Sequence, residues 1–395
     1  MKILSVFGTR PEAIKMAPVV KKLQETFLKS EIKICVTGQH REMLDSVLND
    51  FKIKADYDLD IMSKNQDLFD VTSNVLLGMK KILELSQPDI ILVHGDTSTS
   101  FASALAAFYK GTPVGHIEAG LRTYNFRNPW PEEFNRRAIA SLANFHYAPT
   151  EASKKNLLDE KISNKKIVVT GNTVIDALYM ALDYLESSND LKIKVEDELN
   201  QRKLDTAVIQ NWINKTRKLV LITGHRRESF GSGFNNICQA ILELSSQNPE
   251  VDFLYPVHLN PNVRDAIKNV FGKDVFKNGK KNKNVYFCDP LSYFPFIYMM
   301  KLSHIVMTDS GGIQEEAPSL SKPVVLLRET TERPEAVAAG TVKIVGTDKS
   351  KIKKTVQELL DDIKVYKKMS LSLNPYGDGH ASERIVQHLK CLAKK

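Results

Sequence analysis

Cysteine is scarce in this chain of 395 residues, and the cysteines that occur form no pattern. The four of them, Cys35, Cys238, Cys288 and Cys391, stand singly and without a CxxC spacing. The sequence therefore predicts neither a zinc site nor a disulfide framework. A reducing cytoplasm is the simplest location for such a protein.

Long apolar runs and a secretory leader are also lacking. No stretch approaches the roughly 18–20 apolar residues that a membrane-spanning helix needs. The first residues, MKILSVFGTRPE, carry one lysine before a short strand-like run, which is too short and wrongly flanked for a signal peptide. We therefore expect no membrane association.

The basic runs contain no interleaved aromatic residues. The net charge is +8, and part of the excess lies in runs such as KNGKKNKN at 277–284. A surface that binds nucleic acid typically places aromatic side chains among its cations. We interpret these runs as solvated surface charge and expect no nucleic-acid partner, whereas a small anionic ligand remains compatible with them.

What is present indicates two α/β domains. Apolar residues make up 42% and charged residues 26% of the chain, which are globular values, and the length fits two domains. Strand-like and helix-like patterns alternate, which favours mostly parallel sheets. The phrase KLVLITGHRRESFG at 218–231 repeats the order of the opening: strand, glycine, basic residue, glutamate, helix. We predict two Rossmann-like domains, 1–171 and 172–374, with the last helix, about 375–395, completing the first.

Acidic residues follow two neighbouring strands of the first half. Asp96 ends DIILVHGD, Glu118 follows TPVGHI, and Glu132 and Glu133 come after Pro131 at a helix start. Because the carboxyl ends of parallel strands face one crevice, these acids predict proton-transfer chemistry. Two simpler interpretations stay open. Asp96 is also a suitable helix cap, and Glu132 has the i,i+4 spacing of a helix ion pair with Arg136.

Phosphate-binding features lie in the second half. Ser310, Gly311 and Gly312 stand between a strand and a helix, where backbone N–H groups bind phosphate well. Glu316, about a turn and a half into that helix, is placed to accept hydrogen bonds from sugar hydroxyls. Arg333, in a loop after a strand, suits a phosphate contact. A plain tight turn is the alternative for Ser-Gly-Gly, since the dinucleotide fingerprint GxGxxG is absent.

Basic residues occupy equivalent strand ends in both halves. His225 and Arg226 follow a strand of the second half, while Arg10, with Lys15 a turn later, follows the first strand of the chain. A lone histidine is usually structural, but beside arginines at a strand end it favours ligand contact. Carboxylates in one half and diphosphate-binding features in the other predict a nucleotide-sugar enzyme with an active-site cleft between the domains.

Eleven phrases stand in order along the whole chain, namely FGTRPEAIKMAP, GQHREMLD, LVHGDTSTS, PVGHIEAGLRT, PWPEEFNR, TGNTVIDAL, TGHRRESFG, YPVHLNPNVR, TDSGGIQEEAPSL, TTERPEA and NPYGDGHASERI. Together they resemble those of the non-hydrolysing UDP-N-acetylglucosamine 2-epimerases. The resemblance implies a GT-B-like architecture, a homodimer, and reversible conversion of UDP-GlcNAc to UDP-ManNAc through elimination of UDP to a 2-acetamidoglucal, without metal or cofactor. In that family the product commonly supplies surface polysaccharide.

The resemblance also assigns residues. Its catalytic positions match Asp96, Glu118, Glu132, Arg136 and His225, although which acid serves which step is not assigned. Its UDP-binding positions match a second set, in which Phe296 has a plain core aromatic as its alternative. That set is Arg10, Lys15, Phe296, Ser310, Gly311, Gly312, Glu316 and Arg333.

Members of this family also bind a second UDP-GlcNAc as an activator. Gln39, Arg226 and His258 match positions of that activator site. Glu42 and Asn65 replace a glutamine and an arginine of some members, so the contacts of an activator here stay open.

Other functions remain to be distinguished. A hydrolysing relative would release free ManNAc and UDP, and no single residue excludes it. A GT-B glycosyltransferase would transfer the sugar to an acceptor, but it usually needs one base rather than three carboxylates. A protein that only binds UDP-sugars leaves the acids unexplained, and an epimerase for a more modified UDP-sugar is compatible with the sequence.

Overall fold

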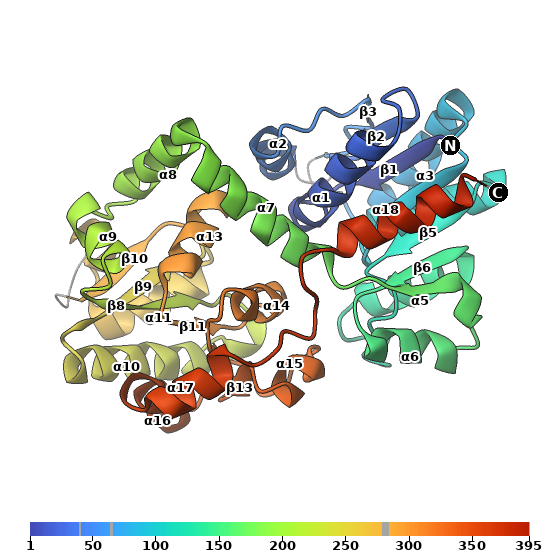
Figure 1. Ribbon diagram of the computed structural model, residues 1–395. Helices are drawn as coiled ribbons and strands as arrows, with labels where there is room; N and C mark the ends of the chain where they lie inside the picture. Colours follow the sequence, from blue (N-terminus) through green and yellow to red (C-terminus); the bar gives the residue numbers. More distant parts are fainter. Residues whose placement is uncertain (39–40, 64–65, 279–283, 395) are drawn as a thin grey trace. The chain divides into compact units, whose positions relative to one another are not determined.

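The computed structural model describes residues 1–38, 41–63, 66–278 and 284–394, without the side chains of Glu42, Lys277 and Asn278. The chain forms two compact α/β units (Figure 1). Unit 1 comprises Met1–Tyr179 and Tyr376–Lys395, and unit 2 comprises Met180–Pro375. The last helix, α18 (Ala381–Leu392), lies in unit 1, where it packs against α1 (Arg10–Thr26).

Unit 1 is built on a seven-stranded parallel sheet in the order β3-β2-β1-β4-β5-β6-β7. Adjacent strands are in a register that pairs Ser5 of β1 with Leu92 of β4 and Val93 of β4 with His116 of β5. The strands are β1 (Ile3–Phe7), β2 (Ile32–Val36), β3 (Tyr57–Asp58), β4 (Ile90–His94), β5 (Val114–Ile117), β6 (Phe145–Ala148) and β7 (Ile167–Val169).

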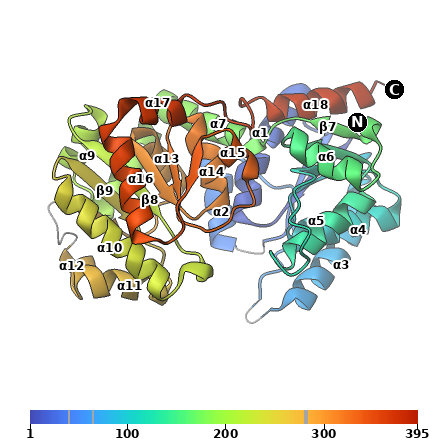
Figure 2. The ribbon, with the colours of Figure 1, turned by 90° about the horizontal axis from the view of Figure 1, so that it is seen from below.

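Helices cover the sheet of unit 1 in two groups. The first group, α3 (Leu68–Ser86), α4 (Ser98–Lys110) and α5 (Glu132–Leu142), lies side by side in Figure 2 and shares a core with β1 and β4. Buried residues of α3 recur at helical spacing, and the small residues of α4 allow the two helices to approach closely. The second group is α1, α2 (Arg41–Asp50) and α18. Helices α6 (Glu151–Asp159) and α7 (Thr173–Ser187) follow β6 and β7.

Unit 2 has a six-stranded parallel sheet in the order β10-β9-β8-β11-β12-β13. Its strands are β8 (Lys218–Thr223), β9 (Val251–Pro256), β10 (Val285–Cys288), β11 (Ile305–Thr308), β12 (Val324–Leu326) and β13 (Val342–Ile344). Helices α10 (Ser232–Gln247), α11 (Pro261–Phe271) and α16 (Lys349–Asp361) pack together over an apolar core of this unit (Figure 2). The other helices are α8 (Asn189–Gln201), α9 (Thr206–Ile213), α12 (Val275–Asn278), α13 (Tyr293–Leu302), α14 (Gly311–Ser319), α15 (Pro334–Ala338) and α17 (Ile363–Ser370).

Both strand orders contain one point where the order reverses. In unit 1 this point lies between β1 and β4, and in unit 2 between β8 and β11. Ligands of such sheets bind beyond the carboxyl ends of the strands at this reversal. The predicted α/β class with two Rossmann-like halves is confirmed, and the strand orders single out the loops after β1, β4, β8 and β11.

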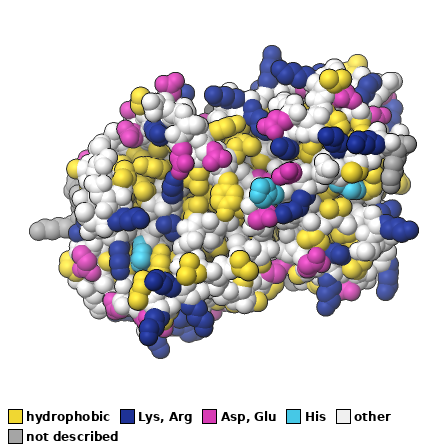
Figure 3. Space-filling model, viewed as in Figure 1, with side chains coloured by type: hydrophobic (Ala, Val, Ile, Leu, Met, Phe, Trp, Pro, Cys, Tyr) yellow, Lys and Arg dark blue, Asp and Glu magenta, His cyan; other side chains and the backbone are white. Residues whose placement is uncertain are grey.

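Surface charge and membrane propensity were also predicted from the sequence. On the face shown in Figure 3, Lys and Arg side chains are distributed among acidic and apolar ones. Residues 279–283 of the basic run at 277–284 lie outside the described residues. Within the described ranges, no helix is both long and apolar enough to cross a membrane.

Candidate active site

Two of the predicted catalytic carboxylates stand at the carboxyl ends of neighbouring strands. Asp96 follows β4 and Glu118 follows β5, which are paired in register with His94 opposite Ile117. Glu132 is the first residue of α5. This helix packs on α4, which begins directly after the Asp96 loop. The parallel sheet thus positions two acids at one edge, and α5 adds further polar side chains to it.

Arg136 joins α5 to the Asp96 loop. Its Nε lies 3.0 Å from Oδ2 of Asp96, and its Nη1 lies 3.3 Å from Oε2 of Glu133. Asn135, one residue earlier, donates from Nδ2 to the backbone carbonyl of Asp96 at 2.9 Å. The helix cap of α4 is Thr97, whose hydroxyl accepts from Ser100 N at 3.0 Å. The alternative in which Asp96 only caps that helix is therefore wrong.

Glu133 fixes the loop that precedes α5. Its side chain is fully buried, and it accepts hydrogen bonds from the backbone N–H groups of Thr123 at 2.9 Å and Tyr124 at 3.0 Å. It also faces the guanidinium of Arg136. Because the Arg136 side chain is only 9% exposed, this pair is shielded from water and holds the arginine beside Asp96.

Glu118 is held in a strained and polar setting. Its backbone has a φ of 62°, in the left-handed region that non-glycine residues rarely adopt outside functional sites and turns. Lys15 of α1 donates to its Oε2, and Asn172, from the loop after β7, donates to the same oxygen at 2.8 Å. Nε2 of His94 lies 3.9 Å from that oxygen. Lys15, predicted to contact UDP, thus pairs with a predicted catalytic acid.

Glu12 ties the first loop of unit 1 to the Asp96 loop. One of its carboxylate oxygens accepts from Gly8 N at 3.0 Å and Thr9 N at 2.8 Å. The other accepts from the hydroxyls of Thr97 at 2.6 Å and Ser100 at 2.9 Å. Burial raises the pKa of Glu12, while these hydrogen bonds act in the opposite direction. The turn that begins α1 with Arg10 is therefore fixed relative to Asp96.

In unit 2, His225 stands at the end of β8, where the strand order reverses. Its ring stacks on that of His258, with centroids 5.2 Å apart and planes 17° apart. Its backbone N–H and that of Arg226 both donate to Oδ2 of Asp309, which follows β11, at 2.7 and 2.8 Å. The Arg226 guanidinium lies 3.8 Å from Oε1 of Glu332.

The predicted phosphate-binding turn has the expected backbone. Ser310 is the cap residue of α14, and Gly311 and Gly312 form its first turn. A Cβ at Gly311 would lie 3.7 Å from Cζ of Arg333, and one at Gly312 would lie 3.8 Å from Oε2 of Glu316. The structure therefore brings together the helix start, a guanidinium and a carboxylate, which suits a phosphate bound beside sugar hydroxyls.

Neighbouring side chains set the orientation of these groups. The Nε of Arg333 donates a hydrogen bond to Oε1 of Glu315, whose side chain is fully buried. Glu316 is 7% exposed, and the hydroxyl of Tyr293 donates to it at 3.4 Å. Phe296 lies one turn further along α13 from Tyr293 and is partly exposed.

Part of the predicted activator site falls outside the described residues. Gln39 and Asn65 lie outside them, as does the side chain of Glu42. Arg226 and His258 are described, and both adjoin His225. Several residues that contact predicted site residues were not assigned to the site from the sequence, among them Glu133, Asn172 and Asp309. Each lies in a quoted phrase, PWPEEFNR, TGNTVIDAL or TDSGGIQEEAPSL, but only the folded chain shows what it contacts.

Comparison with known proteins gives a consistent result. Residues 21–390 match the family model described as UDP-N-acetylglucosamine 2-epimerase. A UDP-N-acetylglucosamine 2-epimerase of Campylobacter jejuni is 52% identical over 98% of this chain and 97% of that protein. A crystal structure of UDP-GlcNAc 2-epimerase from Neisseria meningitidis bound to UDP-GlcNAc has a TM-score of 0.86 at 51% identity, covering 98% of this chain and 99% of the other. The Methanocaldococcus jannaschii enzyme in complex with UDP-GlcNAc and UDP has a TM-score of 0.77 at 31% identity, covering 99% of each chain.

Proposed function

The chain belongs to the UDP-N-acetylglucosamine 2-epimerase family, and we propose that it interconverts UDP-GlcNAc and UDP-ManNAc without hydrolysing either. The observation that carries this proposal is the group of polar side chains at the ends of β4 and β5. Asp96 pairs with Arg136, and Glu118 pairs with Lys15 and Asn172. Inversion at C2 needs proton transfer on both faces of the sugar, and two separately held carboxylates are suited to it.

We propose elimination followed by addition. No carbonyl acidifies the C2 proton of an acetamido sugar, so direct deprotonation is difficult. Instead a carboxylate takes the C2 proton while the C1–O bond breaks and its electron pair leaves with UDP. The resulting 2-acetamidoglucal is protonated at C2 on the other face, and UDP adds back to C1. The acids are Asp96, Glu118 and Glu132, with Arg136 and His225 assisting.

UDP stays bound between the two steps in this proposal. The start of α14 at Ser310–Gly312 and the guanidinium of Arg333 offer donors to the diphosphate, and Phe296 packs near the uracil. Retention of UDP is what separates the epimerase from a hydrolysing relative. The reaction requires no acceptor, and this separates it from a glycosyltransferase.

Proton NMR in D₂O tests the proposed function. The protein incubated with UDP-GlcNAc is expected to give UDP-ManNAc, with deuterium at C2 in both epimers at equilibrium, because the proton removed is replaced from solvent. A chain with Asp96→Asn and Glu118→Gln serves as the blank. Accumulation of free ManNAc and UDP without UDP-ManNAc would contradict the reversible reaction, and turnover only with an added acceptor would indicate a transferase.

We further propose that a second UDP-GlcNAc activates the enzyme through Arg226 and His258, together with Gln39 and Glu42. Arg226 and His258 contact or adjoin His225, so a ligand held by them acts next to a proposed catalytic residue.

The expected product, UDP-ManNAc, is a sugar donor that suits surface polysaccharide synthesis.

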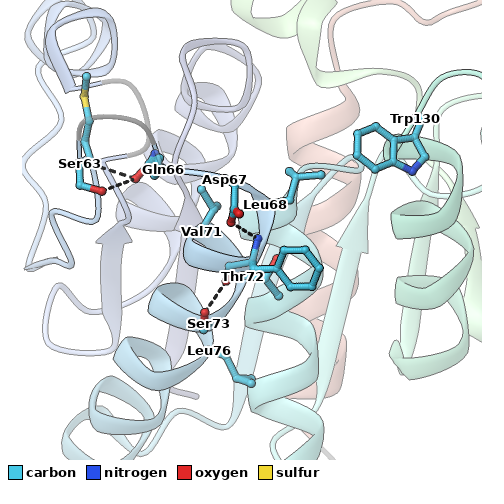
Figure 4. A pocket seen from close by; sticks show the side chains of 11 residues that line it. Ser63, Gln66, Asp67, Leu68, Val71, Thr72, Ser73, Leu76 and Trp130 are labelled. Carbon is cyan, nitrogen blue, oxygen red and sulfur yellow. Dashed lines mark hydrogen bonds between the residues drawn. The ribbon is translucent and has the colours of Figure 1, made fainter.

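We also propose that the enzyme is a homodimer and that α3 and α4 of unit 1 form its interface. Apolar side chains are exposed along both helices, including Phe69 at 84%, Leu77 at 62% and Tyr109 at 68%. Beside them is a cavity of about 1020 Å³ lined by α3 and by Trp130, which faces the helix from a separate segment (Figure 4). Exposed apolar surface of this kind typically marks an interaction site.

The charges on α3 favour a second copy of the same chain as the partner. The exposed Asp67 and Asp70 stand at the start of the helix, whereas the exposed Lys80 and Lys81 lie in its second half. Two copies of α3 related by a twofold axis run antiparallel, so the acids of one copy face the lysines of the other.

Replacing Phe69 and Leu77 with aspartate tests this interface. Each variant side chain occurs twice in a twofold dimer, so the dimer Kd is expected to rise by at least about 100-fold. Light scattering across a concentration series measures the change. Leu373→Asp is the matched control, since Leu373 is an 89% exposed leucine in unit 2. A dimer that persists in the double variant at low concentration, or a wild-type monomer, would contradict the proposal.

A further inference from the structure

Asp309 is a buried carboxylate whose position is not explained by phosphate binding. It is the residue before the Ser310–Gly312 turn, and its side chain is only 2% exposed. Its Oδ2 accepts the backbone N–H groups of His225 and Arg226 at 2.7 and 2.8 Å. The adjacent strands β8 and β11 bring these loops together, with Thr223 paired opposite Thr308.

The other carboxylate oxygen of Asp309 faces the ring of His225. Oδ1 is buried and has no hydrogen-bond partner among the described residues. Nδ1 of His225 lies 3.5 Å from it. A buried carboxylate oxygen without a donor is unfavourable, so a small movement that lets Nδ1–H donate to Oδ1 stabilises the folded chain.

The ring of His225 is restrained from a second side. It stacks on His258, which limits rotation about the side-chain bonds, while 48% of the His225 side chain remains exposed. Burial lowers the pKa of His258, and the neighbouring His225 lowers it further, so a second positive charge beside His225 is disfavoured. Among the described residues of unit 2, the charged groups next to His225 include Asp309 and the adjacent Arg226, whose Nε donates to the backbone carbonyl of Asp309 at 3.2 Å.

We propose that Asp309 is a positioning residue for His225, holding the imidazole with its proton on Nδ1 and leaving Nε2 to act on the substrate. Carboxylate, imidazole and reacting group in this order form an arrangement in which the carboxylate fixes the tautomer and orientation of the ring. The assignment of His225 to catalysis rests on the proposed function, whereas the tautomer does not depend on it.

Asp309→Asn isolates this role. The amide oxygen can still accept the two backbone N–H groups, so the loop is preserved, but the amide nitrogen then presents donors to Nδ1. The ring is expected to change to the tautomer with its proton on Nε2. Turnover should fall about 100-fold or more while KM changes by less than about threefold, since the interaction lost is one that assists the chemical step.

A double variant separates positioning from a structural effect. If Asp309 acts through His225, then Asp309→Asn combined with His225→Ala is no slower than His225→Ala alone. Independent losses that multiply in the double variant would overturn the proposal, because they would show that Asp309 acts by another route.

Nitrogen-15 NMR of histidine-labelled protein supplies a readout that needs no activity. The His225 signal is identified by its loss in His225→Ala, and it is expected to report Nδ1–H in the wild type and Nε2–H in Asp309→Asn. A wild-type ring protonated on Nε2, or a tautomer unchanged by the substitution, would overturn the proposal. Absence of epimerase turnover in the wild type would refute the proposed function while leaving this test of the tautomer intact.

Discussion

Replacing Glu118 with glutamine is expected to lower turnover by about 10²–10⁴-fold, the range typical for loss of a general acid or base. The substitution keeps the size of the side chain and removes its negative charge. Lys15 and Asn172 can still donate to the remaining amide oxygen. The fold of the β5 loop should therefore survive, and kcat rather than KM should carry the loss.

The setting of Glu118 explains why so large an effect is expected. The carboxylate is 7% exposed and stands on a left-handed backbone, an energetically unfavourable conformation that the surrounding contacts must maintain. The next glycine, Gly120, allows that turn to pack closely, because a Cβ there would lie 2.3 Å from the backbone oxygen of Ser153. A strained acid beside a lysine is better explained by catalysis than by stability.

Glu243→Gln provides the matched control for this prediction. Glu243 is also a carboxylate held by lysines, Lys349 and Lys353, but it lies on the surface of unit 2. Its substitution should change turnover by less than twofold. Turnover is measured by NMR or by a coupled assay under saturating UDP-GlcNAc. Undiminished turnover in Glu118→Gln would show that Glu118 is not a catalytic residue.

The sequence predicted the parts of the site that depend on local pattern. Asp96 and Glu118 each follow a short apolar run, and parallel strands place such residues at one edge of the sheet. Ser310–Gly312 stands between a strand and a helix, so its place at the start of α14 also followed from local pattern. Alternation of strands and helices was sufficient for the fold class as well.

The contacts that orient these groups depend on tertiary packing and could not be read from spacing. Lys15 lies 103 positions from Glu118, and no periodicity connects them. Arg136 pairs with Asp96, 40 positions away, and only its second partner, Glu133, lies at a helical i,i+3 spacing. Asp309 carries no local signal of its role, because its partner is the backbone of the loop after β8, 84 positions away.

Acid is expected to destabilise unit 1 strongly, because three adjacent strands of its sheet carry buried histidines. Burial lowers the pKa of His94 on β4 to about 4, of His116 on β5 to about 3 and of His146 on β6 to about 4. The ordinary value is 6.5. Below pH 6.5 these histidines therefore bind protons in the unfolded chain, whereas in the folded chain they bind protons only at about pH 4 or lower.

The sign and size of the effect follow from this difference. A group whose pKa is lowered by folding makes stability fall as pH decreases from its unfolded to its folded value. Each of these histidines lowers the free energy of unfolding by about 3–5 kcal/mol over that range, at 1.36 kcal/mol per pH unit. Together they approach the whole stability of a typical domain. Burial raises the pKa of Glu12 and Asp176, which act in the opposite direction at the acid end.

His116→Gln tests this prediction with little disturbance to the structure. Nε2 of His116 lies 2.7 Å from the carbonyl of Gly95, and a glutamine amide can donate to the same oxygen. The free energy of unfolding is measured by urea unfolding followed by circular dichroism at pH 7, 6, 5 and 4. Between pH 7 and pH 4 it should fall by about 3 kcal/mol less in the variant than in the wild type. His380→Gln, at a 62% exposed side chain, should run parallel to the wild type. If the free energy of unfolding of His116→Gln also falls with pH in parallel with the wild type, then protonation of this buried histidine does not cause the loss of stability in acid. The carboxylates would then govern that loss.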